Sequence, residues 1–148
     1  MTESPRGSGR CGCGEGPRAC AFAKALLAQQ ATCGLAHRRS IGEQSLVECA
    51  SPAALGDCST LAALLRERAR FALRLPPETR PLLHMQALRL QCGGLEALHG
   101  VLDSAERDVH RLVGLAQQRH GSLADLPWAA LVPPLAAWQP WRRRPATR

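Results

Sequence analysis

Thiol groups are the chemically most distinctive side chains of this sequence, which has seven cysteines in 148 residues. A chain of this length can bury a hydrophobic core without help from metals or disulfides. The count is odd, whereas small secreted domains that depend on disulfides normally have an even number. We therefore expect thiols that bind something, not a disulfide framework. The seven are Cys11, Cys13, Cys20, Cys33, Cys49, Cys58 and Cys92.

The spacing of these cysteines favours one kind of metal centre over another. The sequence has no C-x-x-C pair, and structural zinc usually takes its ligands as two closely spaced pairs. Iron–sulfur clusters accept single cysteines from separate parts of a chain. An iron–sulfur cluster is therefore the preferred cofactor and zinc the less favoured one. The predicted ligands, each at an expected helix end or loop, are Cys33, Cys49, Cys58 and Cys92.

The remaining cysteines are weaker candidates for that centre. If Cys20 and Cys33 shared one straight helix, thirteen steps of about 100° would put them on nearly opposite sides. Cys11 and Cys13 lie in a Gly-rich segment and, with Cys20, could form a separate soft-metal or reactive-thiol site. Two alternatives stay open. The thiols could be core residues, because cysteine is often buried, or they could act as a thiol–disulfide redox sensor.

Catalytic patterns are absent from the sequence. No G-x-S-x-G turn and no phosphate-binding glycine loop is present. No two histidines stand three or four residues apart, the spacing of helical metal pairs. The sequence therefore favours a protein that is not an enzyme.

The C-terminal residues suggest an interaction surface. Tryptophan and arginine are enriched at protein interfaces, and aromatics interleaved with arginines also serve single-stranded nucleic acid. A protein partner is the favoured interpretation and nucleic acid a minor one. The alternative is that the first two tryptophans pack on the core while the arginines are solvated. The candidate partner-binding residues are Trp128, Trp138, Trp141, Arg142, Arg143 and Arg144.

Composition places the chain in a soluble class. Residues 1–18 lack the apolar region of a secretory signal, and no apolar run is long enough to span a bilayer. We therefore expect a cytoplasmic protein without a membrane partner. The net charge of +7 comes from arginines spread along the chain, a distribution typical of a solvated surface.

Local signals predict helices almost throughout and no strand. Ser40 with Glu43, and Asp103 with Glu106, have the form of capping boxes that open helices. Ser51 before Pro52 predicts a short helical turn, and Asp57 is the expected N-cap of the longest helix. The predicted helices cover residues 18–32, 40–49, 58–75, 79–92, 95–102 and 103–121, with Gly93–Gly94 as an interruption.

These elements lead to a fold and a function. We expect an all-α protein, an irregular bundle of six or seven short to medium helices, with residues 1–17 as a flexible tail and 18–148 as a single domain. The expected function is that of a small iron–sulfur or other metal-binding accessory protein for electron transfer, cluster delivery or redox sensing. The alternative is a metal-free helical adaptor that docks a protein partner through its Trp/Arg-rich C-terminal tail.

Overall fold

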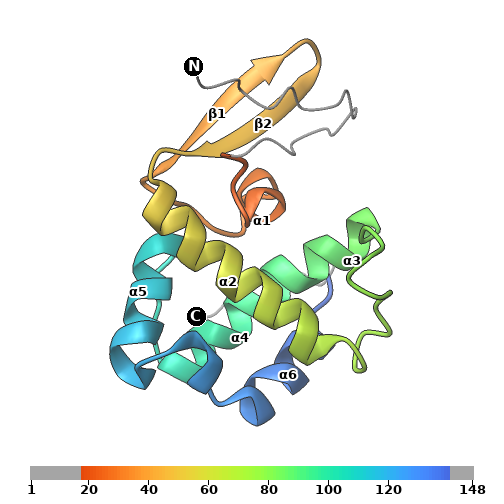
Figure 1. Cartoon of the computed structure of the whole chain (residues 1–148), viewed down its shortest axis with the longest axis vertical. Coiled ribbons are helices and arrows are strands. Elements are labelled where there is room, and N and C mark those ends of the chain that lie inside the picture. The colour runs from red at the N-terminus through yellow and green to blue at the C-terminus, as the bar shows by residue number, and fades with distance from the viewer. Residues whose placement is uncertain (1–17, 141–148) are drawn as a thin grey trace, which may run out of the picture.

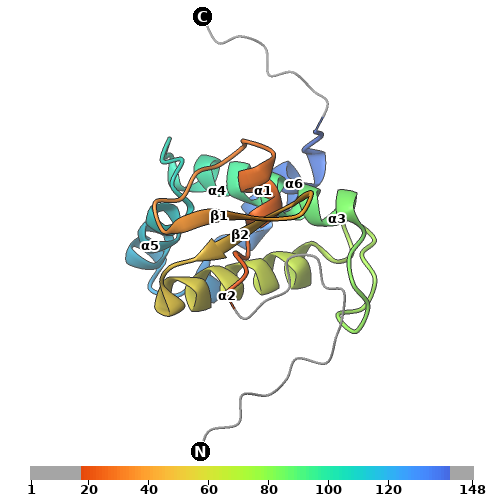
Figure 2. The ribbon, with the colours of Figure 1, turned by 90° about the horizontal axis from the view of Figure 1, so that it is seen from above.

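A computed structural model describes residues 18–140 of the chain. The helices gather in one part of the molecule, and an antiparallel hairpin projects from one end (Figure 1). Seen from above, α2 (Pro52–Ala69) lies on one side of the hairpin, and α1 (Ala23–Leu27) and α4 (Gly94–Leu102) lie on the other (Figure 2). The prediction of an all-α bundle is therefore wrong: the protein is mostly helical but contains a two-stranded sheet.

The hairpin is formed by β1 (Ala36–Ile41) and β2 (Gln44–Cys49), with Ile41 paired to Gln44 and Ala36 to Cys49. Gly42 in the connecting turn has φ of +61°, a conformation that glycine adopts without steric cost. The segment that the sequence predicted as a helix opened by Ser40 is thus a hairpin. The apparent capping box coincides with a two-residue turn, and alternate residues of β2 face the core.

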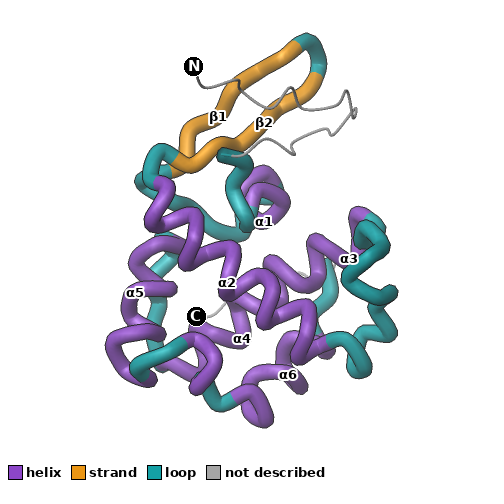
Figure 3. The backbone as a smooth tube through the Cα atoms, in the orientation of Figure 1, coloured by secondary structure: helices purple, strands orange, loops and turns teal. Residues whose placement is uncertain are grey.

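Residues 18–20 lie along the other edge of β2. The Cys20 N–H donates to the Val47 carbonyl at 2.9 Å, and the Cys49 N–H donates to the Arg18 carbonyl at 2.8 Å. The predicted helix over residues 18–32 therefore shrinks to the short α1, because backbone hydrogen bonds to β2 take up the segment before it. The long loop from α1 to β1 is visible in Figure 3.

The longest helix, α2, begins earlier than predicted. Ser51 is its N-cap, with the Ser51 hydroxyl accepting from the Ala54 N–H at 3.2 Å, and Pro52 takes the first helical position. The short turn expected at Ser51 is the start of this helix, so Asp57 is not a cap. The helix ends at Ala69, before the prolines at positions 76 and 77.

The next three helical segments follow one another without a break. They are α3 (His84–Leu88), the π-helix η1 (Arg89–Gly93) and α4. The prediction that Gly93 and Gly94 interrupt this helix is wrong, because both are buried within it. A Cβ on Gly93 would lie 2.9 Å from the Leu135 carbonyl oxygen, and one on Gly94 would lie 2.7 Å from Leu65 Cδ1. The glycines serve close packing, not a turn.

The C-terminal helices complete the core. Asp108, not Asp103, is the N-cap of α5 (Val109–His120), which ends at Gly121 as predicted. After the 3₁₀ turn η2 (Leu123–Asp125), α6 (Trp128–Ala137) forms in the segment that the sequence left as a tail. Helix α6 packs on α4, and α2 contacts α5 and α6. The largest fully buried side chains come from these helices and the segment before α1: Phe22, Leu61, Leu65, Leu98, Leu102, Leu112, Val113, Leu131 and Leu135.

Candidate functional site

Two cysteines lie on the inner face of the hairpin. Side chains alternate between the two faces of a strand, so Cys49 lies on the same face as buried Val47. Cys20 is paired to Val47 through its N–H group, which places it on that face too. Cys49 is 8% exposed, and its thiol donates to the Ser51 carbonyl at 3.3 Å.

Two further cysteines approach this face from other elements. Cys33 lies in the loop before β1, and its carbonyl accepts from the Ala36 N–H at 3.2 Å. Cys58 comes from α2, which contacts β2, and is buried in the main hydrophobic core. The four residues Cys20, Cys33, Cys49 and Cys58 are referred to below as the thiol cluster.

Burial and mutual repulsion raise the pKa of two members of the thiol cluster, Cys58 and Cys20. The pKa of the Cys58 thiol is raised from 9.0 to about 12, first by burial and then by charge on Cys20, Cys33, Cys49 and Asp57. The pKa of Cys20 is also raised, chiefly by burial. A hydrogen bond from the Phe22 backbone opposes this rise, and charge on Cys33 and Cys49 adds to it. Each thiolate that forms here thus makes the next one harder to form.

All five cysteines within residues 18–140 are free thiols. As the side chains stand, no group of three or more His, Cys, Asp or Glu within this range is arranged to hold a metal ion. The thiol cluster is therefore not preformed as a metal site, and any metal bound there requires its side chains to rearrange. Cys20 and Cys33 are only half-buried, which leaves their side chains room to turn.

Cys92, the fourth predicted ligand, lies apart from the thiol cluster. It belongs to η1 and lines a cavity of about 900 Å³ together with Glu96 and His99. Its pKa is raised to about 11, first by burial and then by the Glu96 carboxylate; none of the other cysteines within residues 18–140 contributes. The imidazole of His99 is hydrogen-bonded to the Glu106 carbonyl.

Sequence reasoning set Cys20 aside on a premise that the structure removes. Cys20 and Cys33 would lie on opposite sides only of a shared helix, but Cys20 lies beside β2 and Cys33 in a loop. Cys20 lies next to buried Val47 of β2, and this position depends on tertiary structure. No local pattern around Cys20 indicates it.

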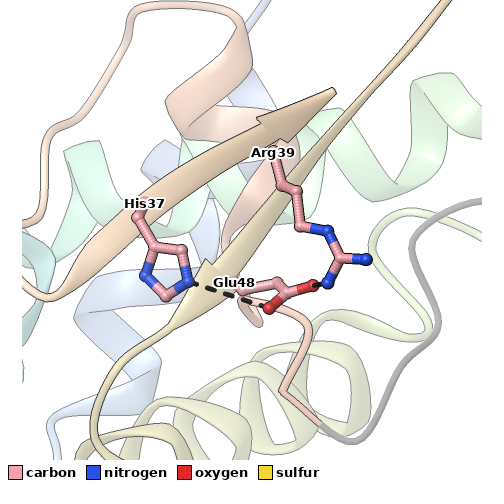
Figure 4. A network of polar contacts seen from close by, with 3 residues as sticks. All are labelled: His37, Arg39 and Glu48. Carbon is pink, nitrogen blue, oxygen red and sulfur yellow. Dashed lines mark hydrogen bonds and ion pairs between the residues drawn. The ribbon is translucent and has the colours of Figure 1, made fainter. Parts of the chain in front are cut away.

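The outer face of the hairpin is polar. Glu48 Oε1 lies 3.3 Å from Arg39 Nη1, and Glu48 Oε2 lies 3.7 Å from His37 Nε2 (Figure 4). His37 and Glu48 are directly opposite each other in the register. This face is solvated while the opposite one carries Cys20, Val47 and Cys49.

The candidate partner-binding residues fall into two groups. Trp128 is 8% exposed, donates from Nε1 to the Ala124 carbonyl at 3.1 Å, and has the Arg68 guanidinium 5.7 Å from its ring centroid. Trp138 is partly buried against the core. Both tryptophans thus contribute to packing. The other candidate partner-binding residues, Trp141, Arg142, Arg143 and Arg144, lie outside the described residues. So do two of the cysteines, Cys11 and Cys13.

Comparison with protein-family models, with curated proteins and with solved structures finds no match for this chain. None of the helices within residues 18–140 combines the length and the apolar character needed to cross a bilayer. Fold and site together define a mostly helical protein with a two-stranded hairpin and a cluster of four free cysteines that includes Cys49 of that hairpin.

Proposed function

We propose that this protein binds a thiolate-ligated metal centre, an iron–sulfur cluster or a single soft ion, through Cys20, Cys33, Cys49 and Cys58. The observation that carries the proposal is that four free cysteines from four separate segments of the chain lie around the inner face of one hairpin. Cys20 replaces Cys92 in the predicted ligand set. The proposed role of the protein is that of an accessory protein in electron transfer, cluster delivery or redox sensing, without catalysis.

The chemistry of the donors supports a soft metal. Four thiolates are the ligand set of tetrahedral zinc and of iron–sulfur clusters. Neighbouring buried thiols resist ionisation because each thiolate destabilises the next, and a bound cation supplies the missing positive charge. Metal binding must release protons, so the affinity rises with pH.

The surroundings of the cluster support the same proposal. Cys49 stands two residues before the N-cap of α2, and its thiol donates a hydrogen bond to the carbonyl of that N-cap, Ser51. On binding metal, Cys49 gives up the hydrogen bond from its thiol to Ser51. Free thiols also fit a reducing compartment, so we place the protein in the cytoplasm.

The test is purification under anaerobic conditions, followed by reconstitution with iron and sulfide or with zinc. Brown protein with charge-transfer absorption identifies a cluster, whereas colourless protein with one zinc per chain identifies a single ion. We expect Cys58→Ser and Cys20→Ser to lose the metal and Cys92→Ser, the matched control, to retain it.

Two outcomes would overturn the proposal. One is a protein that binds neither iron nor zinc after reconstitution, with all its thiols still reactive. The other is equal loss of metal from the Cys92→Ser and Cys58→Ser variants, each checked for native helicity by circular dichroism. That result would place the centre elsewhere.

A further inference from the structure

The outer edge of β1 is an open edge of the sheet. The hairpin projects from the helical part of the molecule (Figure 1), and β2 lies between β1 and residues 18–20. Within residues 18–140, β1 pairs with β2 alone. All residues of β1 after Ala36 are exposed, so most of the strand lies in solvent.

The register shows which backbone groups of β1 point to the open edge. The Val47 carbonyl accepts from the Cys20 N–H at 2.9 Å, so it points away from β1. Arg38 faces Val47 in the register, at a position where the two residues do not bond to each other. The N–H and C=O groups of Arg38 therefore point outward, and those of Ser40, two residues further, do the same. Within residues 18–140 no strand lies along this edge to bond them.

The side chains along this edge are basic. The strand carries His37, Arg38 and Arg39 in succession and no acidic residue. Glu48 of β2 lies beside His37 and Arg39 (Figure 4) and offsets part of their charge. Arg38 makes no ion pair with the described residues; its Nη2 donates to the Leu26 carbonyl at 3.1 Å. The edge therefore carries a positive charge that no carboxylate of residues 18–140 neutralises.

This charge disfavours a second copy of the chain as the occupant of the edge. Exposed edge strands pair readily with one another, and charged edge residues oppose such pairing. If two copies of β1 paired antiparallel about position 38, the two Arg38 side chains would face each other, and pairing about position 39 would oppose the two Arg39 side chains. Like charges directly opposite each other destabilise a sheet. A strand with carboxylates at these positions meets the arginines with the opposite charge.

We propose that the outer edge of β1 binds an extended acidic segment of a partner protein, which adds an antiparallel strand to the sheet. The backbone of the segment exchanges hydrogen bonds with Arg38 and with Ser40, as in other cases of β-augmentation. Two successive carboxylates of the segment face Arg39 and Arg38. An apolar residue near its start packs on Ile41, which is 52% exposed. No member of the thiol cluster lies on β1, so this edge acts independently of any metal.

The first experiment titrates the full-length protein with the acetylated and amidated peptide Thr-Val-Thr-Glu-Glu-Thr. In the proposed register the second glutamate faces Arg38 and the valine faces Ile41. We expect saturable binding that weakens as salt is added. At saturation, amide hydrogen exchange of Arg38 and Ser40 should slow by about tenfold or more, whereas that of Arg39, which bonds to β2, should change little.

N-methylated peptides separate backbone pairing from charge attraction. A methyl group on the nitrogen of the second glutamate removes the N–H that donates to the Arg38 carbonyl, and should weaken binding by about tenfold. The matched control has the methyl group on the first glutamate, whose N–H points away from β1, and should bind like the unmodified peptide. A peptide with lysines in place of both glutamates should not bind.

Variants of the hairpin test the edge on the protein itself. Ser40→Pro removes an outward N–H, at a position where edge strands accept proline, and should weaken binding by about tenfold. Ser45→Pro is the matched control, because Ser45 faces Ser40 in the register but has its N–H on the other edge of the hairpin. Arg38→Gln should weaken binding and reduce its salt dependence, whereas Arg111→Gln, at an exposed position of α5, should change neither.

Four outcomes would overturn the proposal. The first is equal binding of the two N-methylated peptides, which needs no variant of the protein and reduces the interaction to charge attraction. The second is unchanged binding by Ser40→Pro with a native circular dichroism spectrum. The third is the absence of binding at millimolar peptide. The fourth is a dimer, detected by sedimentation equilibrium, that Ser40→Pro dissociates and Ser45→Pro does not, which would assign the edge to a second copy.

Discussion

The Gly34 N–H donates to Asp108 Oδ2 at 2.8 Å, which joins two residues that are 74 positions apart in the chain. The other carboxylate oxygen, Oδ1, accepts from the Arg111 N–H at 3.1 Å and caps α5. Beside this contact, Thr32 forms a parallel bridge to Asp108: the Thr32 N–H donates to the Arg107 carbonyl at 3.0 Å, and the Thr32 carbonyl accepts from the Val109 N–H at 2.8 Å. One carboxylate therefore fixes the loop that carries Cys33 to the start of a core helix.

Replacing Asp108 by alanine should destabilise the protein and loosen the loop of Cys33. Loss of an N-cap costs about 1 kcal/mol, and loss of the Gly34 hydrogen bond adds about 1 kcal/mol. We expect a decrease of about 2 kcal/mol in the free energy of unfolding, measured by urea denaturation. Alkylation of Cys33 should also become faster.

The control for this variant is Asp125→Ala, because Asp125 is exposed and its carboxylate makes no hydrogen bond within residues 18–140. It removes the same charge and should change the stability by less than about 0.5 kcal/mol. Equal effects of the two substitutions would show that the Asp108 contact contributes nothing beyond its charge.

High pH should destabilise the fold partly through Cys92. Its folded-state pKa of about 11 lies above the ordinary 9.0, so the folded protein holds this proton more tightly than the unfolded chain does. The contribution to stability is therefore complete below pH 9 and is lost as the pH rises to 11. Cys92→Ala should flatten the decrease in melting temperature across this range.

Glu96→Gln should also flatten the decrease in melting temperature at high pH, because the Glu96 carboxylate is the second cause of the raised pKa of Cys92. Gly100→Ala, a change without a titrating group, should keep the slope of the unmodified protein. A slope that is identical in the Cys92→Ala variant would contradict the assignment.

Two glycines in the continuous helical stretch from α3 to α4 should have opposite effects on stability when each is replaced by alanine. Gly93→Ala places a Cβ 2.9 Å from the Leu135 carbonyl oxygen and 3.0 Å from Trp138 Cβ, so α6 must move. We expect a loss of about 1–3 kcal/mol. Gly100 has nothing within 4 Å of its Cβ position, and Gly100→Ala should stabilise α4 by about 0.5–1 kcal/mol. Thermal unfolding of both variants checks the difference, and destabilisation by Gly100→Ala would refute it.

The ion pairs on the outer face of the hairpin should contribute little to stability. The side chains of His37 and Arg39 are 53% and 60% exposed, so water and salt screen their attraction to Glu48. We expect Glu48→Gln to lower the stability by less than about 1 kcal/mol at low salt, with the difference vanishing at high salt. A salt-independent loss larger than this would show that Glu48 has a structural role.

Capping chemistry could be predicted where it depends on adjacent residues alone. Ser51 and Pro52 mark the start of α2, because the serine hydroxyl accepts a backbone hydrogen bond and proline lacks an N–H that would need a partner. Gly121 marks the end of α5, because glycine adopts a positive φ without steric cost. The same reasoning failed at Ser40 and Glu43. Their spacing fits a capping box, but the backbone there is satisfied by pairing between strands.

The sequence by itself determined that the chain is largely helical, basic and rich in cysteine, because these properties follow from composition and short-range periodicity. Only the tertiary structure decided that Cys20 joins Cys33, Cys49 and Cys58 and that Cys92 does not. Which cysteines meet depends on the hydrogen bonds between residues 18–20 and β2 and on the packing of α2 beneath the hairpin. Such long-range contacts leave no trace in the spacing of residues along the chain.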